Sequence, residues 1–130
     1  GKEMKFNSQI CTTREQSERL LALGLNKETA DMYYSPFYFE NSLIDYFDAK
    51  VLGGSVREEM MAGYEEYKDY IPAWSLHRLM EMAFNSLNDA DADAEDEIYF
   101  IRQKNPFESM LETFEWLIKK GYFNKEYLEE

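Results

Sequence analysis

The chain has 130 residues, of which 45% are apolar and 16% aromatic, and its formal net charge is −12. This length predicts one domain spanning residues 1–130, and the aromatic content argues against a disordered acidic chain. The charge argues against direct binding of nucleic acid or an anionic membrane surface, because both require clustered Lys and Arg. Gly1 is consistent with a remnant of a cleaved expression tag.

Cysteine usage and apolar runs indicate a cytoplasmic protein. Cys11 is the single cysteine, so neither an intrachain disulfide nor a multi-cysteine zinc site can form. No run approaches the roughly 20 apolar residues of a membrane span, and no signal segment is recognised at the start.

The first predicted helix covers residues 14–23, where Thr13 and Gln16 have capping-box spacing and Gly24 supplies a stop. A second short helix is predicted within residues 27–35, which gives the pair the punctuation of a helix-turn-helix unit. Its outward residues carry net negative charge, so we interpret the motif as a fold element and not as a DNA reader. The apolar residues expected to pack inward are Leu20, Leu21, Leu25 and Met32.

One segment predicts a strand, and a second segment fits either a strand or a helix. Residues 97–103 are rich in β-branched and aromatic residues and predict a strand, with residues 35–40 as its best local partner. Residues 42–52 fit either a helix or a strand, because their apolar positions follow a helical face only loosely.

Two further helices are predicted on either side of Pro72. The first runs from Val56 to about Tyr70, with capping-box spacing between Ser55 and Glu58. The apolar positions that share one face of this helix are Val56, Met60, Tyr64, Tyr67 and Ile71. In the helix after Pro72, the residues predicted to face inward are Leu76, Leu79, Met80 and Ala83.

Residues 85–96 are predicted to form an acidic loop. Asp89, Asp91 and Asp93 have the spacing of the first three ligands of an EF-hand loop. The required glycine and bidentate glutamate are replaced by Ala94 and Phe100. We therefore expect a solvated loop, with weak and nonspecific binding of divalent ions as the alternative.

The clearest helical pattern lies between Asn105, a cap residue followed by a proline, and Gly121, which supplies a left-handed stop. Its apolar stripe consists of Phe107, Met110, Leu111, Phe114, Leu117 and Ile118. Together, these elements predict an α+β fold: a helix-dominated single domain with a small antiparallel sheet.

No residue set predicts catalysis, cofactor binding or metal binding. His77 is the single histidine; on a helix it cannot face Ser75, and we expect an exposed pair with Glu81. The sequence contains no phosphate-binding glycine loop, metal-ligand spacing or nucleophile elbow. An enzyme that uses only acidic side chains is an alternative.

Four aromatic residues are candidates for contact with a protein partner. Trp116 lies outside the apolar stripe of its helix, so it must be covered by another segment or by a partner. Tyr64, Tyr67 and Tyr70 give residues 64–70 a tyrosine-rich face. The sequence leaves the oligomeric state open.

Three segments of the chain together resemble small uncharacterised bacterial proteins that occur with prophages or other mobile elements. These segments are residues 11–32, residues 71–80 and the helix at 106–118. The resemblance implies a cytoplasmic accessory role and brings no catalytic residues. We therefore expect a non-enzymatic protein-interaction module, with an acidic decoy that imitates DNA as the main alternative.

Overall fold

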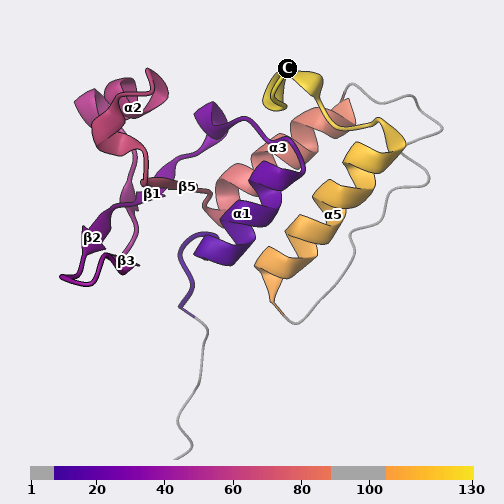
Figure 1. Ribbon diagram of the computed structural model, residues 1–130. Helices are drawn as coiled ribbons and strands as arrows, with labels where there is room; N and C mark the ends of the chain where they lie inside the picture. The colour runs from indigo at the N-terminus through magenta and orange to yellow at the C-terminus, as the bar shows by residue number, and fades with distance from the viewer. Residues whose placement is uncertain (1–7, 89–104) are drawn as a thin grey trace, which may run out of the picture.

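A computed structural model describes residues 8–88 and 105–130 of the chain (Figure 1). The α-helices in these ranges are α1 (Arg14–Ala22), α2 (Gly54–Met61), α3 (Leu76–Asn88) and α5 (Pro106–Lys120). The strands are β1 (Met32–Tyr34), β2 (Pro36–Tyr38), β3 (Ile44–Tyr46), β4 (Lys50–Val51) and β5 (Ile71–Ala73). The 3-10 turns are η1 (Lys27–Thr29), η2 (Glu65–Tyr67) and η3 (Lys125–Tyr127). These elements confirm the predicted α+β class with a small antiparallel sheet.

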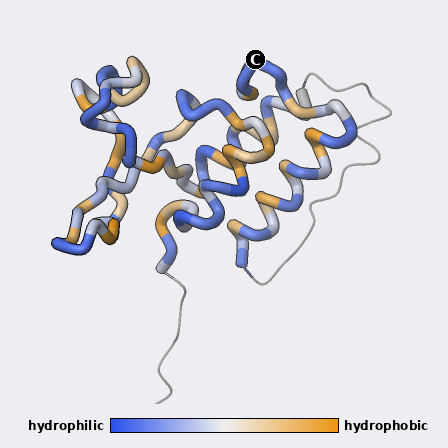
Figure 2. The backbone as a smooth tube through the Cα atoms, in the orientation of Figure 1, coloured by the Kyte–Doolittle hydropathy of each residue, from blue (hydrophilic) through white to orange (hydrophobic). Residues whose placement is uncertain are grey.

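Helices α1, α3 and α5 pack together around the main hydrophobic core (Figure 1). Hydrophobic positions recur along α5, as Figure 2 shows, and those facing the core are buried. The Asn105 side chain accepts a hydrogen bond from the Phe107 N–H, and Gly121 ends the helix at φ +76°. The boundaries predicted for α5 are therefore confirmed.

The strands form two antiparallel sheets. In the first, the order is β4-β1-β5, with Met32 of β1 opposite both Val51 and Ala73. The second is the β2–β3 hairpin, in which Phe37 lies opposite Asp45. In Figure 1, β1 and β5 connect the helices α1, α3 and α5 to α2 and the hairpin.

The α1 prediction is confirmed, whereas the predicted second helix is reduced to the 3-10 helix Lys27–Thr29, capped by Asn26. Thr13 and Gln16 form both hydrogen bonds of the capping box. After Gly24, the chain makes only the turn η1 and then enters β1, because pairing with β4 and β5 satisfies its backbone there. Of the residues predicted to pack inward, Leu21 is half-buried and the others are buried: Leu20, Leu25 and Met32.

The helix predicted from Val56 to Tyr70 is also too long. Helix α2 ends at Met61, and Gly63 follows it in the left-handed conformation, which stops a helix. The predicted capping box is absent, because Gly53 is the N-cap and makes no side-chain cap bond. The following residues form η2 and β5.

The inward face of α3 is rotated from the predicted one. Leu79 and Ala83 are buried and Leu76 is half-buried, but Met80 is exposed. The packing of α3 against α5 buries Met82 instead. Residues 85–88, predicted as part of the acidic loop, continue α3.

The ambiguous segment 42–52 forms strands, not a helix. It contributes β3 and β4, and β3 is the partner of β2. Residues 35–40 therefore contain a strand as predicted, and its partner among the described residues is β3. Residues 97–103 and the EF-hand-like positions Asp89, Asp91 and Asp93 lie outside the described residues.

Candidate protein-interaction surface

The three tyrosines predicted as partner contacts lie at a groove of about 260 Å³ between the end of α1, α2 and η2. The Tyr67 and Tyr70 rings are 4.7 Å apart, and Tyr70 also stacks on Tyr33 at 5.9 Å. The Tyr67 hydroxyl donates to Glu59 at 2.7 Å, and this bond raises the pKa of Tyr67 to about 12. Tyr67 and Tyr70 thus have partners within the chain, while Tyr64 is exposed.

Trp116 lies on a different part of the molecule. It is half-buried on α5, with its ring 5.7 Å from that of Tyr122, so another segment covers it in part. Figure 1 shows α5 and α2 on opposite sides of the fold. The structure therefore does not join Trp116 and the tyrosine groove into one surface.

Among the described residues, no hydrogen bond or ion pair joins His77 to Ser75 or Glu81. His77 is exposed, and the expected partner Glu81 instead forms an ion pair with Arg78 Nε at 3.2 Å. The Ser75 hydroxyl donates to the Asp31 carboxylate at 2.5 Å. His77, Ser75 and Asp31 therefore do not form a triad.

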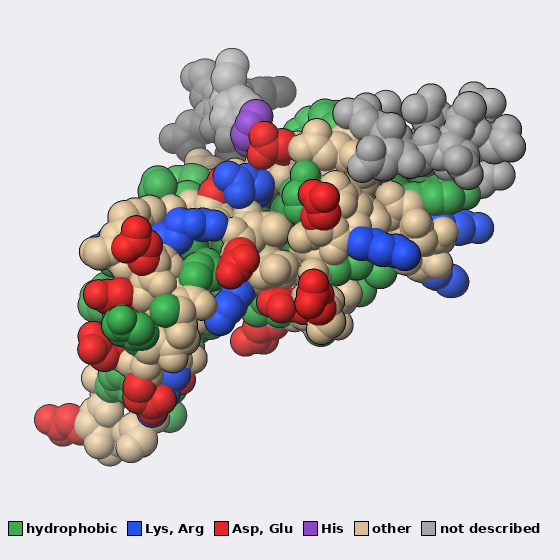
Figure 3. Space-filling view, turned by 90° about the horizontal axis from the view of Figure 1, so that it is seen from above, with side chains coloured by type: hydrophobic (Ala, Val, Ile, Leu, Met, Phe, Trp, Pro, Cys, Tyr) green, Lys and Arg blue, Asp and Glu red, His purple; other side chains and the backbone are tan. Residues whose placement is uncertain are grey.

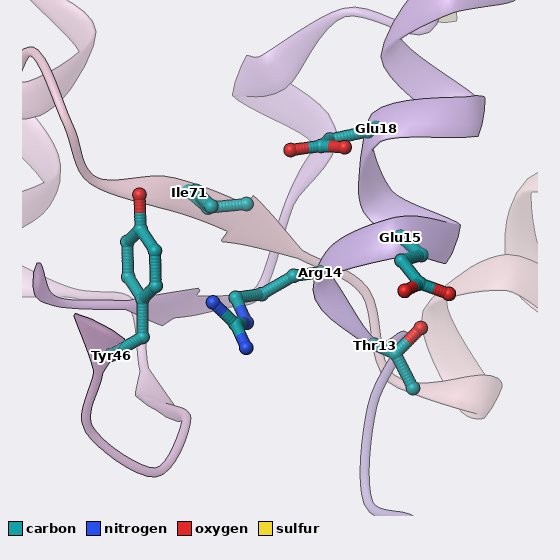
Figure 4. A pocket seen from close by; sticks show the side chains of 6 residues that line it. All are labelled: Thr13, Arg14, Glu15, Glu18, Tyr46 and Ile71. Atoms are coloured by element: carbon teal, nitrogen blue, oxygen red, sulfur yellow. The ribbon is translucent and has the colours of Figure 1, made fainter. Parts of the chain in front are cut away.

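A hollow of about 430 Å³ separates the start of α1 from the β2–β3 hairpin (Figure 4). The side chain of Arg14 extends from α1 toward Tyr46 of β3, and its guanidinium carbon is 4.9 Å from the ring centroid. Glu18 of α1 and Ile71 of β5 also line the hollow. The cation–π contact links the hairpin to α1.

Alternation along β2 and β3 places four apolar side chains on one side of the hairpin. We call this surface, formed by Phe37, Phe39, Leu43 and Phe47, the Phe face. Phe37 lies at its centre, with its ring 5.2 Å from that of Phe39 and 4.6 Å from that of Phe47. The exposed fractions are 49% for Phe39, 64% for Leu43 and 53% for Phe47.

The opposite side of the hairpin makes two contacts with the rest of the fold, although Tyr38 and Ile44 on that side remain 59% and 41% exposed. The Tyr38 hydroxyl donates to Asp69 at 2.5 Å, which raises the pKa of Tyr38 to about 12. Tyr46, on the same side, carries the cation–π contact with Arg14. These two contacts orient the hairpin and leave the Phe face directed away from them.

The backbone at each outer edge of the hairpin is poorly suited to pairing with another strand. Pro36 of β2 has no N–H to donate, and the Tyr46 N–H of β3 donates to Asp45 Oδ1 at 2.8 Å. A partner would therefore contact the hairpin mainly through side chains.

Sequence reasoning missed the Phe face, although a local signal for the hairpin exists. Asn41 and Ser42 separate two short apolar runs, which is typical of a turn between strands. In the structure, the Ser42 N–H donates to the Phe39 carbonyl at 3.0 Å, and Ser42 adopts φ +64°.

Acidic and basic side chains are interspersed on the molecular face in Figure 3, without a continuous row of carboxylates. On this face, the mixture does not favour a decoy that imitates the phosphates of DNA. Within the described ranges, no group of three or more His, Cys, Asp or Glu residues could hold a metal ion. Nor does any helix there have the length and apolarity to cross a membrane.

Comparison with protein-family models, curated proteins and solved structures finds no match to this chain.

Proposed function

We propose that this protein is a non-enzymatic accessory protein that binds another protein through the Phe face. The observation that carries the proposal is the exposure of Phe39, Leu43 and Phe47 on a hairpin whose other side is attached to the fold. Clustered exposed apolar side chains are typical of interaction sites. A cytoplasmic role associated with a mobile element is part of this proposal, supported by the sequence resemblance and by buried, unpaired Cys11.

The exposed rings of Phe39 and Phe47 can each contribute to the stability of a complex. A Phe side chain buries roughly 150–250 Å² when fully covered, so a half-exposed ring leaves on the order of 100 Å² for a partner. At about 25 cal/mol per Å², covering each of Phe39 and Phe47 contributes about 2.5 kcal/mol. Free energies of this size are typical of hot-spot residues in protein interfaces.

Two polar residues that line the hollow beside the hairpin already form contacts within the fold. The hydroxyl of Thr13 accepts the capping bond from the Gln16 N–H, and Arg14 is held against Tyr46. Thr13 and Arg14, two of the polar residues that line this hollow, therefore have structural roles.

The experiment compares partner capture by the wild-type protein and a Phe39→Ser/Phe47→Ser variant, both immobilised, from an extract of the source cells. Val51→Thr is the matched control, because Val51 is exposed on β4 outside the Phe face. We expect a protein retained by wild type and by the control to bind the double variant at least about 100-fold more weakly. Circular dichroism checks that each variant is folded.

Equal retention by the double variant would overturn the proposal. A Tyr64→Ser variant distinguishes the alternative contact predicted from the sequence. If this variant alone loses the captured protein, the interaction surface is the tyrosine groove and not the Phe face.

A further inference from the structure

A carboxylate lies within the otherwise apolar Phe face. Asp45 pairs across the hairpin with Phe37 and lies two residues from both Leu43 and Phe47, so the four side chains project from the same side. One oxygen of Asp45 accepts the hydrogen bond from the Tyr46 N–H. Among the described residues, no Lys or Arg forms an ion pair with Asp45.

The charge around this carboxylate is also negative. Residues 35–49 contain Glu40, Asp45 and Asp48 and no Lys or Arg. A partner that covers the Phe face removes water from Asp45, and a desolvated carboxylate without a cation is strongly unfavourable. The partner must therefore bring a positive charge to the centre of the contact.

Arginine fits this position better than lysine. Its guanidinium is planar and weakly hydrated, can bond a carboxylate through two N–H groups and can stack on aromatic rings. Asp45 and the ring of Phe37 are cross-strand neighbours, so one guanidinium can contact both.

Building on the proposed function, we propose that the partner presents an arginine flanked by apolar side chains. The arginine pairs with Asp45, and its apolar neighbours cover Phe39 and Phe47. A second copy of this chain is a poor occupant, because joining two Phe faces brings two Asp45 carboxylates together and residues 35–49 supply no cation.

Selection from a library of short random peptides displayed on phage tests this inference. The library is selected on the wild-type protein and depleted on the Phe39→Ser/Phe47→Ser variant, so that only binders dependent on the Phe face remain. We expect these peptides to share an arginine between apolar residues. Replacing that arginine with glutamine should weaken binding to wild type about tenfold or more.

The Asp45→Asn variant isolates the role of the charge, because asparagine retains an oxygen that can accept the Tyr46 N–H. For this variant, we expect the arginine and glutamine peptides to bind within about twofold of each other. A matched Asp48→Asn variant, which changes a nearby exposed acid, should keep most of the preference for arginine.

The outcomes separate this inference from the proposed function. Phe-dependent peptides without a basic residue, or an unchanged affinity after the arginine replacement, would overturn the inference and leave the proposed function standing. Failure to select any Phe-dependent peptide would overturn both. A dimer, or binding to phosphatidylcholine vesicles, that is lost in Phe39→Ser/Phe47→Ser would also overturn both in favour of a second copy or a lipid surface.

Discussion

Replacing Asp31 should weaken the connection between the sheet and the helical core. Asp31 precedes β1, and its carboxylate accepts hydrogen bonds from the Ser75 N–H at 2.8 Å and the Ser75 hydroxyl at 2.5 Å. The Ser75 hydroxyl oxygen in turn accepts from the Arg78 N–H at 3.1 Å, which caps the start of α3. One carboxylate thus positions the helix cap against the sheet.

The expected cost follows from these bonds. A hydrogen bond to a charged group contributes about 1.5–3 kcal/mol, and values near the lower end apply here because half-buried Asp31 is partly accessible to water. We expect Asp31→Ala to lower the free energy of unfolding by about 2–4 kcal/mol. Asp31→Asn, which retains one acceptor oxygen, should lower it by about 1 kcal/mol. The loss expected for Asp31→Ala is a substantial part of the unfolding free energy of a domain, which is typically roughly 5–15 kcal/mol.

Urea unfolding followed by circular dichroism measures these losses in Asp31→Ala, Ser75→Ala and the double variant. Ser75→Ala removes the cap and should cost about 1–2 kcal/mol. Because the two residues share their bonds, the double variant should lose at least about 1 kcal/mol less than the sum of the single losses. A loss below about 0.5 kcal/mol for Asp31→Ala, or additive losses, would show that Asp31 and Ser75 do not stabilise the fold through their shared hydrogen bonds.

Two further predictions concern the hairpin turn and the contact between α1 and α5. Ser42→Gly should raise the free energy of unfolding in urea by about 0.5–1 kcal/mol, because Ser42 adopts φ +64° and glycine does so without strain; a loss of stability would contradict this. Hydrogen bonds from Gln16 and Arg19 lower the pKa of Glu108 in the folded protein. The ionised carboxylate therefore stabilises the fold above the unfolded pKa of about 4.3, and this stabilisation is lost as pH falls through the folded-state pKa. Glu108→Gln should therefore be less stable than wild type near pH ~7, and the difference in unfolding free energy should close towards pH ~3; an unchanged difference, or the same trend in exposed Glu126→Gln, would contradict this.

The helices whose ends are governed by neighbouring residues could be predicted from the amino-acid sequence alone. The capping box of Thr13 and Gln16 begins α1, and Asn105 and Gly121 bound α5. Each of these signals acts within a few residues along the chain, so it does not depend on the rest of the fold. The aromatic content and the spread of acidic residues were likewise sufficient to predict a folded acidic domain.

The elements whose partners are distant along the chain could not be predicted in this way, because their conformation depends on long-range contacts. Residues 32–34 became a strand because β4 and β5 pair with them, and α3 buries Met82 in place of Met80 because of its contact with α5. The candidate interaction surface belongs to this second group. Alternation predicts that Phe37 and Phe39 share a side of their strand, but the pairing register decides which side chains of β3 join them, and the rest of the fold decides how exposed they are. Exposure is a property of the assembled fold, because it depends on what the other segments cover.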